Sequence, residues 1–298
     1  MTSQVDLHLH TTASDGAYTP AAVVALARDR GLRTIAITDH DSVEGLAEAL
    51  ATAGHGLEAI PGVEINTDIP HSDEAPSRPP FRGVRRDGAS EVHILGYYVD
   101  YRHAELQDVL RKLRDFRRDR ARRMVEKLAR LGMPLDWQRV AALAGEGAVG
   151  RPHVAQALVE RGYVTDVSQA FDRYIGREGP AYVERHKLTP VEATRLIVRA
   201  GGLPALAHPS GLANLPLLLD ELTAAGLVGL EAYYTGYLPE ETQSLLLLAQ
   251  KYGLVATGGS DFHGGSILPH ADLGSVFVPM AAVAALQSRL DDSRRTGC

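Results

Sequence analysis

The chain has almost no cysteine: its 298 residues include one, Cys298, at the last position. A single thiol cannot form an intrachain disulfide, and it excludes a metal site made of several thiolates. Any metal ion in this chain must therefore be bound by nitrogen and oxygen ligands. Long apolar runs are missing too, because no uninterrupted stretch approaches the roughly 20 residues of a membrane-spanning helix.

The chain also lacks a strong excess of charge and a recognisable signal sequence. Its formal net charge is −6, with 45% hydrophobic and 23% charged residues, which is typical of a soluble globular protein. A negative net charge does not favour stable binding to duplex nucleic acid. The N-terminus has neither a basic start nor an apolar stretch. We therefore predict a cytoplasmic protein without a membrane partner, and the sequence defines no oligomeric state.

Short apolar runs alternate with helical patterns in the first and last thirds of the chain. Strands are predicted at 5–9, 34–37, 57–65, 92–97, 203–206, 229–233 and 255–257. Helices are predicted at 20–30, from about 42, after 190, at 215–225 and at 239–252. Alternating strands and helices favour a parallel sheet with helical crossovers.

The middle of the chain differs, because strand patterns disappear between 103 and 183. A long helix is predicted at 104–131 and a shorter one at 153–161. Residues 111–130 contain ten Lys or Arg against three Asp or Glu, which makes this helix strongly basic. We predict an α/β domain formed by 1–102 and 184–298, with an all-helical insertion domain at 103–183. The proline-rich segment 67–90 is predicted to be a loop or flap.

Two histidines on the first predicted strand are the first sign of a metal site. Side chains alternate between the two faces of a strand, so His8 and His10 share a face. Histidine is only intermediate in its preference for burial, and a buried strand has little structural reason to carry two of them. The pair therefore favours metal binding over an incidental polar face.

Further histidines and carboxylates follow the ends of the other predicted strands. The candidates are His40, Glu64, His93, His208, Asp261 and His263, with Asp15 in the loop after the first strand. In a parallel α/β architecture these strand ends meet on one rim, where active sites form. A lone histidine at a strand end is more often structural, but the joint placement of this set predicts a metal centre.

The ligand types limit the metal and the reaction. Histidine nitrogen combined with carboxylate oxygen suits Mn, Fe or Zn. Nine candidate ligands are too many for one ion, so we predict two or three divalent ions, with Glu64 as a bridging ligand. Three such ions facing Glu64, Asp15 and Asp261 leave a charge of about +3, which favours a phosphate ester and acidifies a bridging water. Amide hydrolysis uses the same machinery and stays open on this argument.

The ordered motifs resemble those of the PHP (polymerase and histidinol phosphatase) family over nearly the whole chain. The matching segments are His8 and His10 with Ser14-Asp15-Gly16, then Thr38-Asp39-His40-Asp41, Gly62-Val63-Glu64, the single histidines His93 and His208, and Asp261 with His263. The resemblance implies a distorted (β/α)7 barrel with an all-helical insertion. Within the family it points to the stand-alone bacterial branch, which includes phosphatases of nucleotide 3′,5′-bisphosphates and a 5′-to-3′ exoribonuclease.

The resemblance also implies how the ligands are shared. One metal takes His8, His10, Glu64 and Asp261; a second shares Glu64 and adds His93 and His208; the third takes Asp15, His40 and His263. Within the insertion, Gly150-Arg151-Pro152-His153 resembles the same branch. Arg151 and His153 near a helix N-terminus make a phosphate-binding site, unless Arg151 is simply solvated. Arg117 and Arg120 are further candidates for substrate binding, although most of that basic helix is expected to be a solvated face.

Our hypothesis is hydrolysis of a phosphomonoester on a small nucleotide of the 3′,5′-bisphosphate type by a metal-bridging hydroxide. His208, His263 and Asp261 form the predicted catalytic group. The leaving alkoxide is expected to be protonated by His208 or His263, if not fully committed as metal ligands, or by a metal-bound water. One alternative is a 5′-3′ exoribonuclease on short 5′-phosphorylated RNA, so the partner is a small nucleotide or a short oligonucleotide. The others are a histidinol-phosphate phosphatase and a non-enzymatic, metal-stabilised accessory module.

Overall fold

The computed structural model describes residues 3–54, 56–69, 91–145, 149–184, 187–264 and 271–296. They form two compact units. The barrel unit contains the described residues up to Asp108 and those from Leu188 onward, and the helical unit contains those from Val109 to Lys187. The predicted division of the chain into one domain of residues 1–102 and 184–298 and an inserted domain of residues 103–183 stays a prediction. Most of the proline-rich segment lies outside the described residues.

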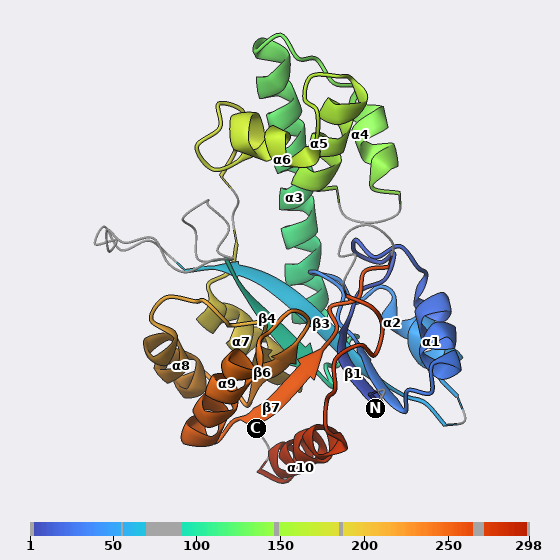
Figure 1. Cartoon of the computed structure of the whole chain (residues 1–298), viewed down its shortest axis with the longest axis vertical. Helices are drawn as coiled ribbons and strands as arrows, with labels where there is room; N and C mark the ends of the chain where they lie inside the picture. Colours follow the sequence, from blue (N-terminus) through green and yellow to red (C-terminus); the bar gives the residue numbers. More distant parts are fainter. Residues whose placement is uncertain are drawn as a thin grey trace. The chain divides into compact units, whose positions relative to one another are not determined.

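The barrel unit is built on one seven-stranded sheet, whose strands follow one another in sequence order (Figure 1). The strands are β1 (Val5–Leu9), β2 (Thr34–Ile37), β3 (Glu58–Asp68), β4 (Glu91–Tyr97), β5 (Leu203–Leu206), β6 (Gly229–Tyr234) and β7 (Val255–Gly259). The two ends of the sheet meet through a parallel bridge between Leu9 and Phe262. The backbone N–H of Asp261 also donates to the carbonyl of His8. The predicted barrel is confirmed.

The sheet is not parallel throughout, which corrects the expectation from the strand–helix alternation. β4 pairs antiparallel with both neighbours, β3 and β5, whereas the other strand pairs are parallel. A parallel pair needs a long crossover, usually a helix, but an antiparallel pair does not. The sequence between β3 and β4 has no helical pattern, so the reversal of β4 is consistent with its composition. This reversal is the distortion of the barrel.

Helices flank the sheet on the outside (Figure 1). They are α1 (Pro20–Asp29), α2 (Leu46–Thr52), α7 (Pro190–Arg199), α8 (Leu215–Ala224), α9 (Pro239–Tyr252) and α10 (Met280–Thr296). Thr19 caps α1 by accepting from the N–H of Ala22, with Pro20 in the first turn as the sequence predicts. α2 begins four residues later than expected, and α10 was not predicted.

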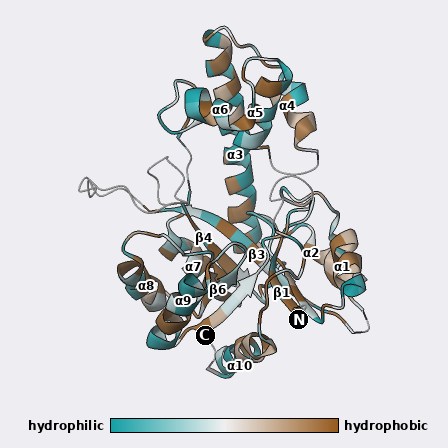
Figure 2. Cartoon of the chain, in the orientation of Figure 1, coloured by the Kyte–Doolittle hydropathy of each residue, from teal (hydrophilic) through white to brown (hydrophobic). Residues whose placement is uncertain are grey.

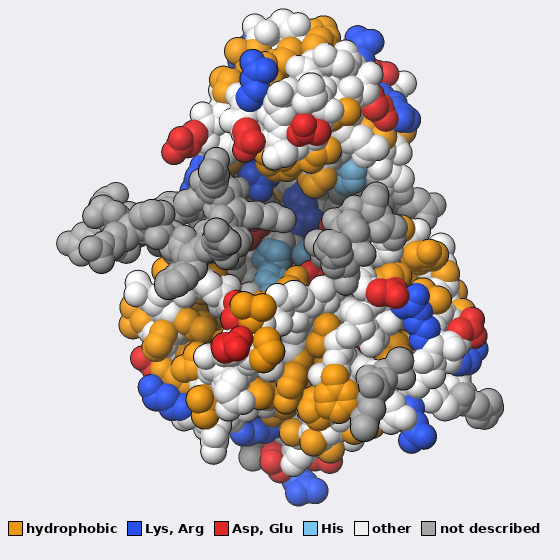
Figure 3. All heavy atoms as spheres, viewed as in Figure 1, with side chains coloured by type: hydrophobic (Ala, Val, Ile, Leu, Met, Phe, Trp, Pro, Cys, Tyr) orange, Lys and Arg blue, Asp and Glu red, His pale blue; other side chains and the backbone are white. Residues whose placement is uncertain are grey.

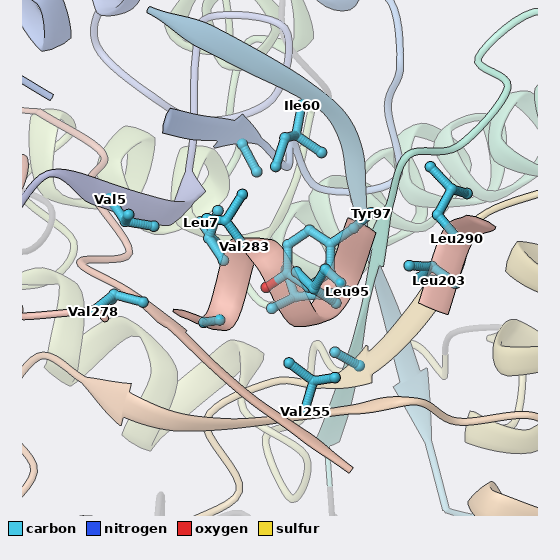
Figure 4. Packing of buried hydrophobic residues seen from close by; sticks show 14 of the residues in the cluster. Val5, Leu7, Ile60, Leu95, Tyr97, Leu203, Val255, Val278, Val283 and Leu290 are labelled. Carbon is cyan, nitrogen blue, oxygen red and sulfur yellow. The ribbon is translucent and has the colours of Figure 1, made fainter. Parts of the chain in front are cut away.

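The helix α10 contributes to a hydrophobic cluster of the barrel core, shown in Figure 4. Its buried side chains Ala282, Val283, Leu286 and Leu290 join apolar residues of the strands in one cluster. Figure 2 shows hydrophobic colouring along the strands. Burial of these side chains contributes roughly 25 cal/mol of folding free energy per Å² of apolar surface. It thereby holds in place the strands whose ends carry the predicted metal ligands.

The helical unit contains no strand among its described residues. Its helices are α3 (Ala104–Arg130), which starts in the barrel unit, α4 (Trp137–Leu143), α5 (Arg151–Glu160), α6 (Val167–Ala170) and a π-helical turn, η1 (Phe171–Ile175). A separate cluster of buried residues, including Leu128, Val154 and Leu158, forms its core. Among the described residues of the whole chain, no helix is long and apolar enough to cross a membrane.

Candidate metal centre

The barrel unit brings all nine predicted metal ligands together. They come from six of the seven strands or from the residues just after them: His8 and His10 from β1, His40 from β2, Glu64 from β3, His93 from β4, His208 from β5, and Asp261 and His263 from β7. Asp15, from the loop after β1, completes the set. The side chains of His40, His93 and His208 are 14%, 16% and 25% exposed. Histidine atoms are visible at the surface in Figure 3, so the cluster reaches solvent.

Glu64 lies at the middle of this cluster and is fully buried. Five imidazoles surround its carboxylate. The nitrogen–oxygen distances are 2.8 Å from His40 and His93, 3.1 Å from His208, and 3.3 Å from His8 and His10. One oxygen faces His93 and His208 and the other faces the remaining three rings. A carboxylate shared in this way is suited to bridge two metal ions.

Two aspartates complete the anionic part of the cluster. The Oδ1 atom of Asp261 lies 3.0 Å from Nε2 of His10 and 3.4 Å from Nε2 of His8. The Oδ1 atom of Asp15 lies 3.3 Å from Nε2 of His263 and 3.9 Å from Nδ1 of His10. Each carboxylate therefore faces at least two imidazole nitrogens.

Several polar atoms of the cluster are buried without a hydrogen bond. Among the described residues they include Nε2 of His8, both ring nitrogens of His10, Oδ1 of Asp15, Oε2 of Glu64 and Nε2 of His93. Leaving such atoms unpaired costs about 1–3 kcal/mol each, so a native structure needs a reason for them. A bound cation provides one, because the carboxylate oxygens and one nitrogen of each neutral imidazole carry lone pairs suitable for coordination.

Three overlapping groups have the spacing to hold a metal ion. They are His10, Asp15, His40 and His263; then His8, His10 and Asp261; and finally His40, Glu64 and His93. The residues present therefore fit divalent ions. His10 and His40 each take part in two groups, whereas the resemblance implied one metal for each. Which residue serves which ion stays a prediction.

The close packing of acids and imidazoles shifts their pKa values strongly. Burial lowers the pKa of His10, but the nearby carboxylates of Asp261 and Glu64 outweigh it and raise this pKa to about 10. For His93, Glu64 outweighs burial and raises the pKa to about 9. Burial alone raises the pKa of Glu64, yet the surrounding imidazoles bring it well below its usual value. The metal-free centre therefore holds protons where ions would bind.

Backbone strain is concentrated at the same rim. His208 has a φ of 28° and Asp261 a φ of 57°, in the left-handed region that non-glycine residues rarely adopt. Each such residue costs on the order of 1–3 kcal/mol and persists only where its surroundings hold it. Strain at two predicted ligands fits a functional site better than a structural one.

The comparisons with known proteins agree with this geometry. Residues 6–108 match the model of the PHP domain. A 5′-3′ exoribonuclease of Haemophilus influenzae is 34% identical over 269 residues, which cover 88% of this chain and 91% of that protein. The chain belongs to the PHP family.

Two further PHP relatives match over most of the chain. A 3′,5′-nucleoside bisphosphate phosphatase of Chromobacterium violaceum is 31% identical over 280 residues, covering 91% of this chain and 92% of that protein. The crystal structure of a protein described as a metal-dependent phosphoesterase from Bifidobacterium adolescentis has a TM-score of 0.77 and 31% identity, with 96% of each chain covered. This PHP protein is a metal-dependent hydrolase of phosphoric esters.

The PHP centre is held by carboxylates that were not predicted as site residues. Asp6 accepts hydrogen bonds from the N–H and hydroxyl of Ser260, at 2.8 and 2.6 Å, and from the N–H of Gly274 at 2.8 Å. Asp39 accepts from Thr11 and Ser14. Asp39 lies within the Thr38–Asp41 motif quoted above, and Asp6 lies on β1 two residues before His8. An aspartate in or directly after an apolar strand was the available signal.

A glycine allows the close approach of β7 to β1 behind the PHP centre. A Cβ at Gly259 would lie 2.5 Å from both the nitrogen and the Cβ of His8. We expect Gly259→Ala to destabilise the protein by about 1–3 kcal/mol, because the strands must separate. It should also weaken metal binding, since His8 moves. Urea unfolding and metal titration test this.

Gly54→Ala is the matched control, because a Cβ there would meet only one backbone oxygen at 4.0 Å. Equal stability of the Gly259→Ala protein and its parent would show that the contact has no role.

The four predicted substrate-binding residues all lie in the helical unit. Arg151 begins α5, and its guanidinium lies 5.3 Å from the ring centre of Phe171. Nδ1 of His153 accepts from the N–H of Gly150 at 3.0 Å, which caps this helix. The structure therefore gives His153 a structural role in addition to its predicted one.

Some of the arginines of the basic helix α3 make contacts within the helical unit. Nε of Arg120 donates to the carbonyl of Val183 at 2.6 Å, and its guanidinium lies 5.2 Å from the ring centre of Tyr182. Arg122 stacks over Trp137 at 4.9 Å. Arg117 is half-buried. The roles of Arg117 and Arg120 in substrate binding stay predictions.

Proposed function

We propose that this PHP protein hydrolyses a phosphomonoester of a small nucleotide, with 3′,5′-bisphosphates as the substrate class. The observation that carries the proposal is the convergence of six imidazoles and three carboxylates, with Glu64 at the middle. The Chromobacterium violaceum relative, a 3′,5′-nucleoside bisphosphate phosphatase, supports the substrate class.

The nine residues would hold two or three divalent ions, and Mn, Fe or Zn suits their nitrogen and oxygen donors. Such ions supply positive charge for the phosphoryl group and lower the pKa of water. The leaving alkoxide would be protonated by a metal-bound water or by whichever of His208 and His263 is not fully committed as a metal ligand. Of the two, His208 is better placed, because its side chain is 25% exposed against 5% for His263. Asp261 orients His8 and His10 through the distances above.

In this proposal the second phosphate of the substrate binds at the N-terminus of α5. The helix has ten residues, and the positive end of its dipole attracts anions. Arg151 and His153 add a guanidinium and an imidazole there. We accordingly propose that residues 103–183 form a domain inserted for substrate binding.

A 5′-3′ exoribonuclease is the second candidate. The Haemophilus influenzae relative carries that name, and residues 111–130 contain ten Lys or Arg, a charge that favours a longer anionic strand. The metal centre would act on a phosphate ester in both cases, but the scissile group is a monoester in the bisphosphate and a diester in RNA. The two candidates therefore differ in the type of ester and in the length of the bound nucleotide.

Phosphate release by the Mn-loaded protein from 3′,5′-bisphosphoadenosine, beside a 5′-phosphorylated RNA trinucleotide, tests the proposal. We expect release from the bisphosphate without degradation of the RNA. Stepwise release of mononucleotides from the RNA would identify an exoribonuclease instead. Inactivity of the metal-loaded protein on both substrates would contradict both candidates.

Alanine at Arg151 and His153 together should lower kcat/KM for the bisphosphate by roughly 10–100-fold, the value of one or two charge-assisted hydrogen bonds. The matched control is Arg161→Ala, which removes an exposed arginine just after the other end of α5. A double variant with unchanged kcat/KM would exclude this phosphate site.

A further inference from the structure

Strand β6 supplies none of the nine candidate ligands, although every other strand of the barrel supplies at least one. Its described side chains nevertheless reach the centre. Glu231 is fully buried, and its two carboxylate oxygens bind residues of two different strands. Oε1 lies 3.0 Å from Nδ1 of His8, and Oε2 accepts from the backbone N–H of His208 at 2.7 Å.

The contact with His8 determines which ring nitrogen faces the centre. A carboxylate only accepts hydrogen bonds, so Nδ1 of His8 must carry the hydrogen. The lone pair is then on Nε2, which lies 3.3 Å from Glu64 and 3.4 Å from Asp261. A second carboxylate that fixes the tautomer and orientation of a metal-binding histidine also raises its basicity.

The contact with His208 stabilises a strained backbone. His208 has a φ of 28°, and its N–H points to the buried Oε2 of Glu231 rather than to a carbonyl of a neighbouring strand. Without this acceptor the N–H would lose a charge-assisted hydrogen bond, which is among the stronger kinds in proteins. One carboxylate of β6 thus positions a side chain of β1 and the backbone after β5.

Tyr234, three residues further along β6, orients the carboxylate of Asp261. Its hydroxyl donates to Oδ2 of Asp261 at 2.7 Å, which leaves Oδ1 facing His8 and His10. The tyrosine ring lies 5.3 Å from the ring of His208. The aspartate also has a φ of 57°, so its side-chain direction needs support from outside its own loop.

We propose that Glu231 and Tyr234 are positioning residues that orient His8, His208 and Asp261 for metal binding. This inference rests on the proposed metal centre. It is independent of the substrate, since the positioning acts on the ligands and not on the phosphate ester. A merely structural role would make the two residues matter for stability and leave the affinity for metal unchanged.

The test uses Glu231→Gln and Tyr234→Phe in the full chain. Glutamine keeps the volume, but its amide has one acceptor oxygen for two donors, so one contact is lost. Phenylalanine removes only the hydroxyl. The matched control is Tyr233→Phe, which removes the same atom from the adjacent residue of β6. Mn²⁺ affinity is measured by titration calorimetry on chelator-treated protein, and the absorption spectrum of the Co²⁺-loaded protein reports ligand geometry.

We expect Mn²⁺ affinity to fall roughly 10–100-fold in Glu231→Gln, the range for outer partners of metal ligands, and to fall in the same direction in Tyr234→Phe. The Co²⁺ spectrum should change in both and stay the same in Tyr233→Phe. Parental affinity and spectrum in both test variants would overturn the proposal. So would an equal loss in the Tyr233→Phe control, or a loss explained by a lower Tm of the metal-free variants. If the parent binds Mn²⁺ without releasing phosphate, the proposed function fails while this test is still decided by affinity.

Discussion

Replacing Glu64 with glutamine is expected to reduce phosphate release at least about 100-fold, more than the loss of an outer partner of a metal ligand. The physical reason is the number of groups that share this carboxylate. Five imidazoles lie within 3.3 Å of its two oxygens. The neutral amide has one fewer acceptor and no charge, so it neither bridges two cations nor balances them. Steady-state phosphate release and metal content per protein measure the effect.

Glu58→Gln is the matched control for this substitution. Glu58 lies on the same strand, β3, but is exposed, and its hydrogen bonds to Gln287 and Thr34 are long, at 3.3 and 3.4 Å. Its replacement should leave both activity and metal content at the parental level. A Glu64→Gln protein that retains two or more ions and most of its activity would contradict the bridging role.

Removal of the metal ions with a chelator is expected to abolish hydrolysis, and readdition of Mn²⁺ should restore it. The pH dependence of rebinding follows from the protons that the empty centre holds. With pKa values raised to about 10 and about 9, His10 and His93 are protonated at neutral pH and must release these protons to coordinate a metal. Affinity should therefore rise with pH, by about tenfold per unit for each proton released.

Calorimetry in buffers with different ionisation enthalpies counts these protons directly. Metal uptake with no proton release at pH 7 would show that the imidazoles are already neutral. In the metal-free protein, the ion pairs of His10 and His93 stabilise the fold fully below the unfolded pKa of about 6.5. That stabilisation is lost as pH rises through the folded values of about 9 and about 10.

The ligand set could be predicted from the sequence because strand periodicity and strand ends carry geometric information. His8 and His10 share a face by alternation alone, and a residue just after an apolar strand lies on the rim of a barrel. The partition among ions was not accessible in this way. His40 lies 2.8 Å from Glu64 and 3.9 Å from Asp15, a difference set by side-chain rotamers.

Glu231 was not predicted as a site residue, because the sequence of its own strand gives no sign that this glutamate is buried. The segment Gly229–Tyr234 predicts a strand, and one glutamate in it is compatible with an exposed edge. The burial of Glu231 becomes apparent only when His8 of β1 and the backbone after β5 are placed around its side chain. The direction of β4 was missed for a similar reason, since apolar runs do not encode strand polarity.

The closure of the barrel has a consequence for how the protein matures. Asp6 bonds to Ser260, 254 residues away along the chain, and Leu9 meets Phe262. Contacts of such long range form late, because the entropy of closing the loop must be overcome first. During synthesis the first histidines leave the ribosome long before Asp261 and His263 are made. Metal capture by the complete ligand set therefore marks the end of folding, and a chain stalled before its seventh strand lacks part of that set.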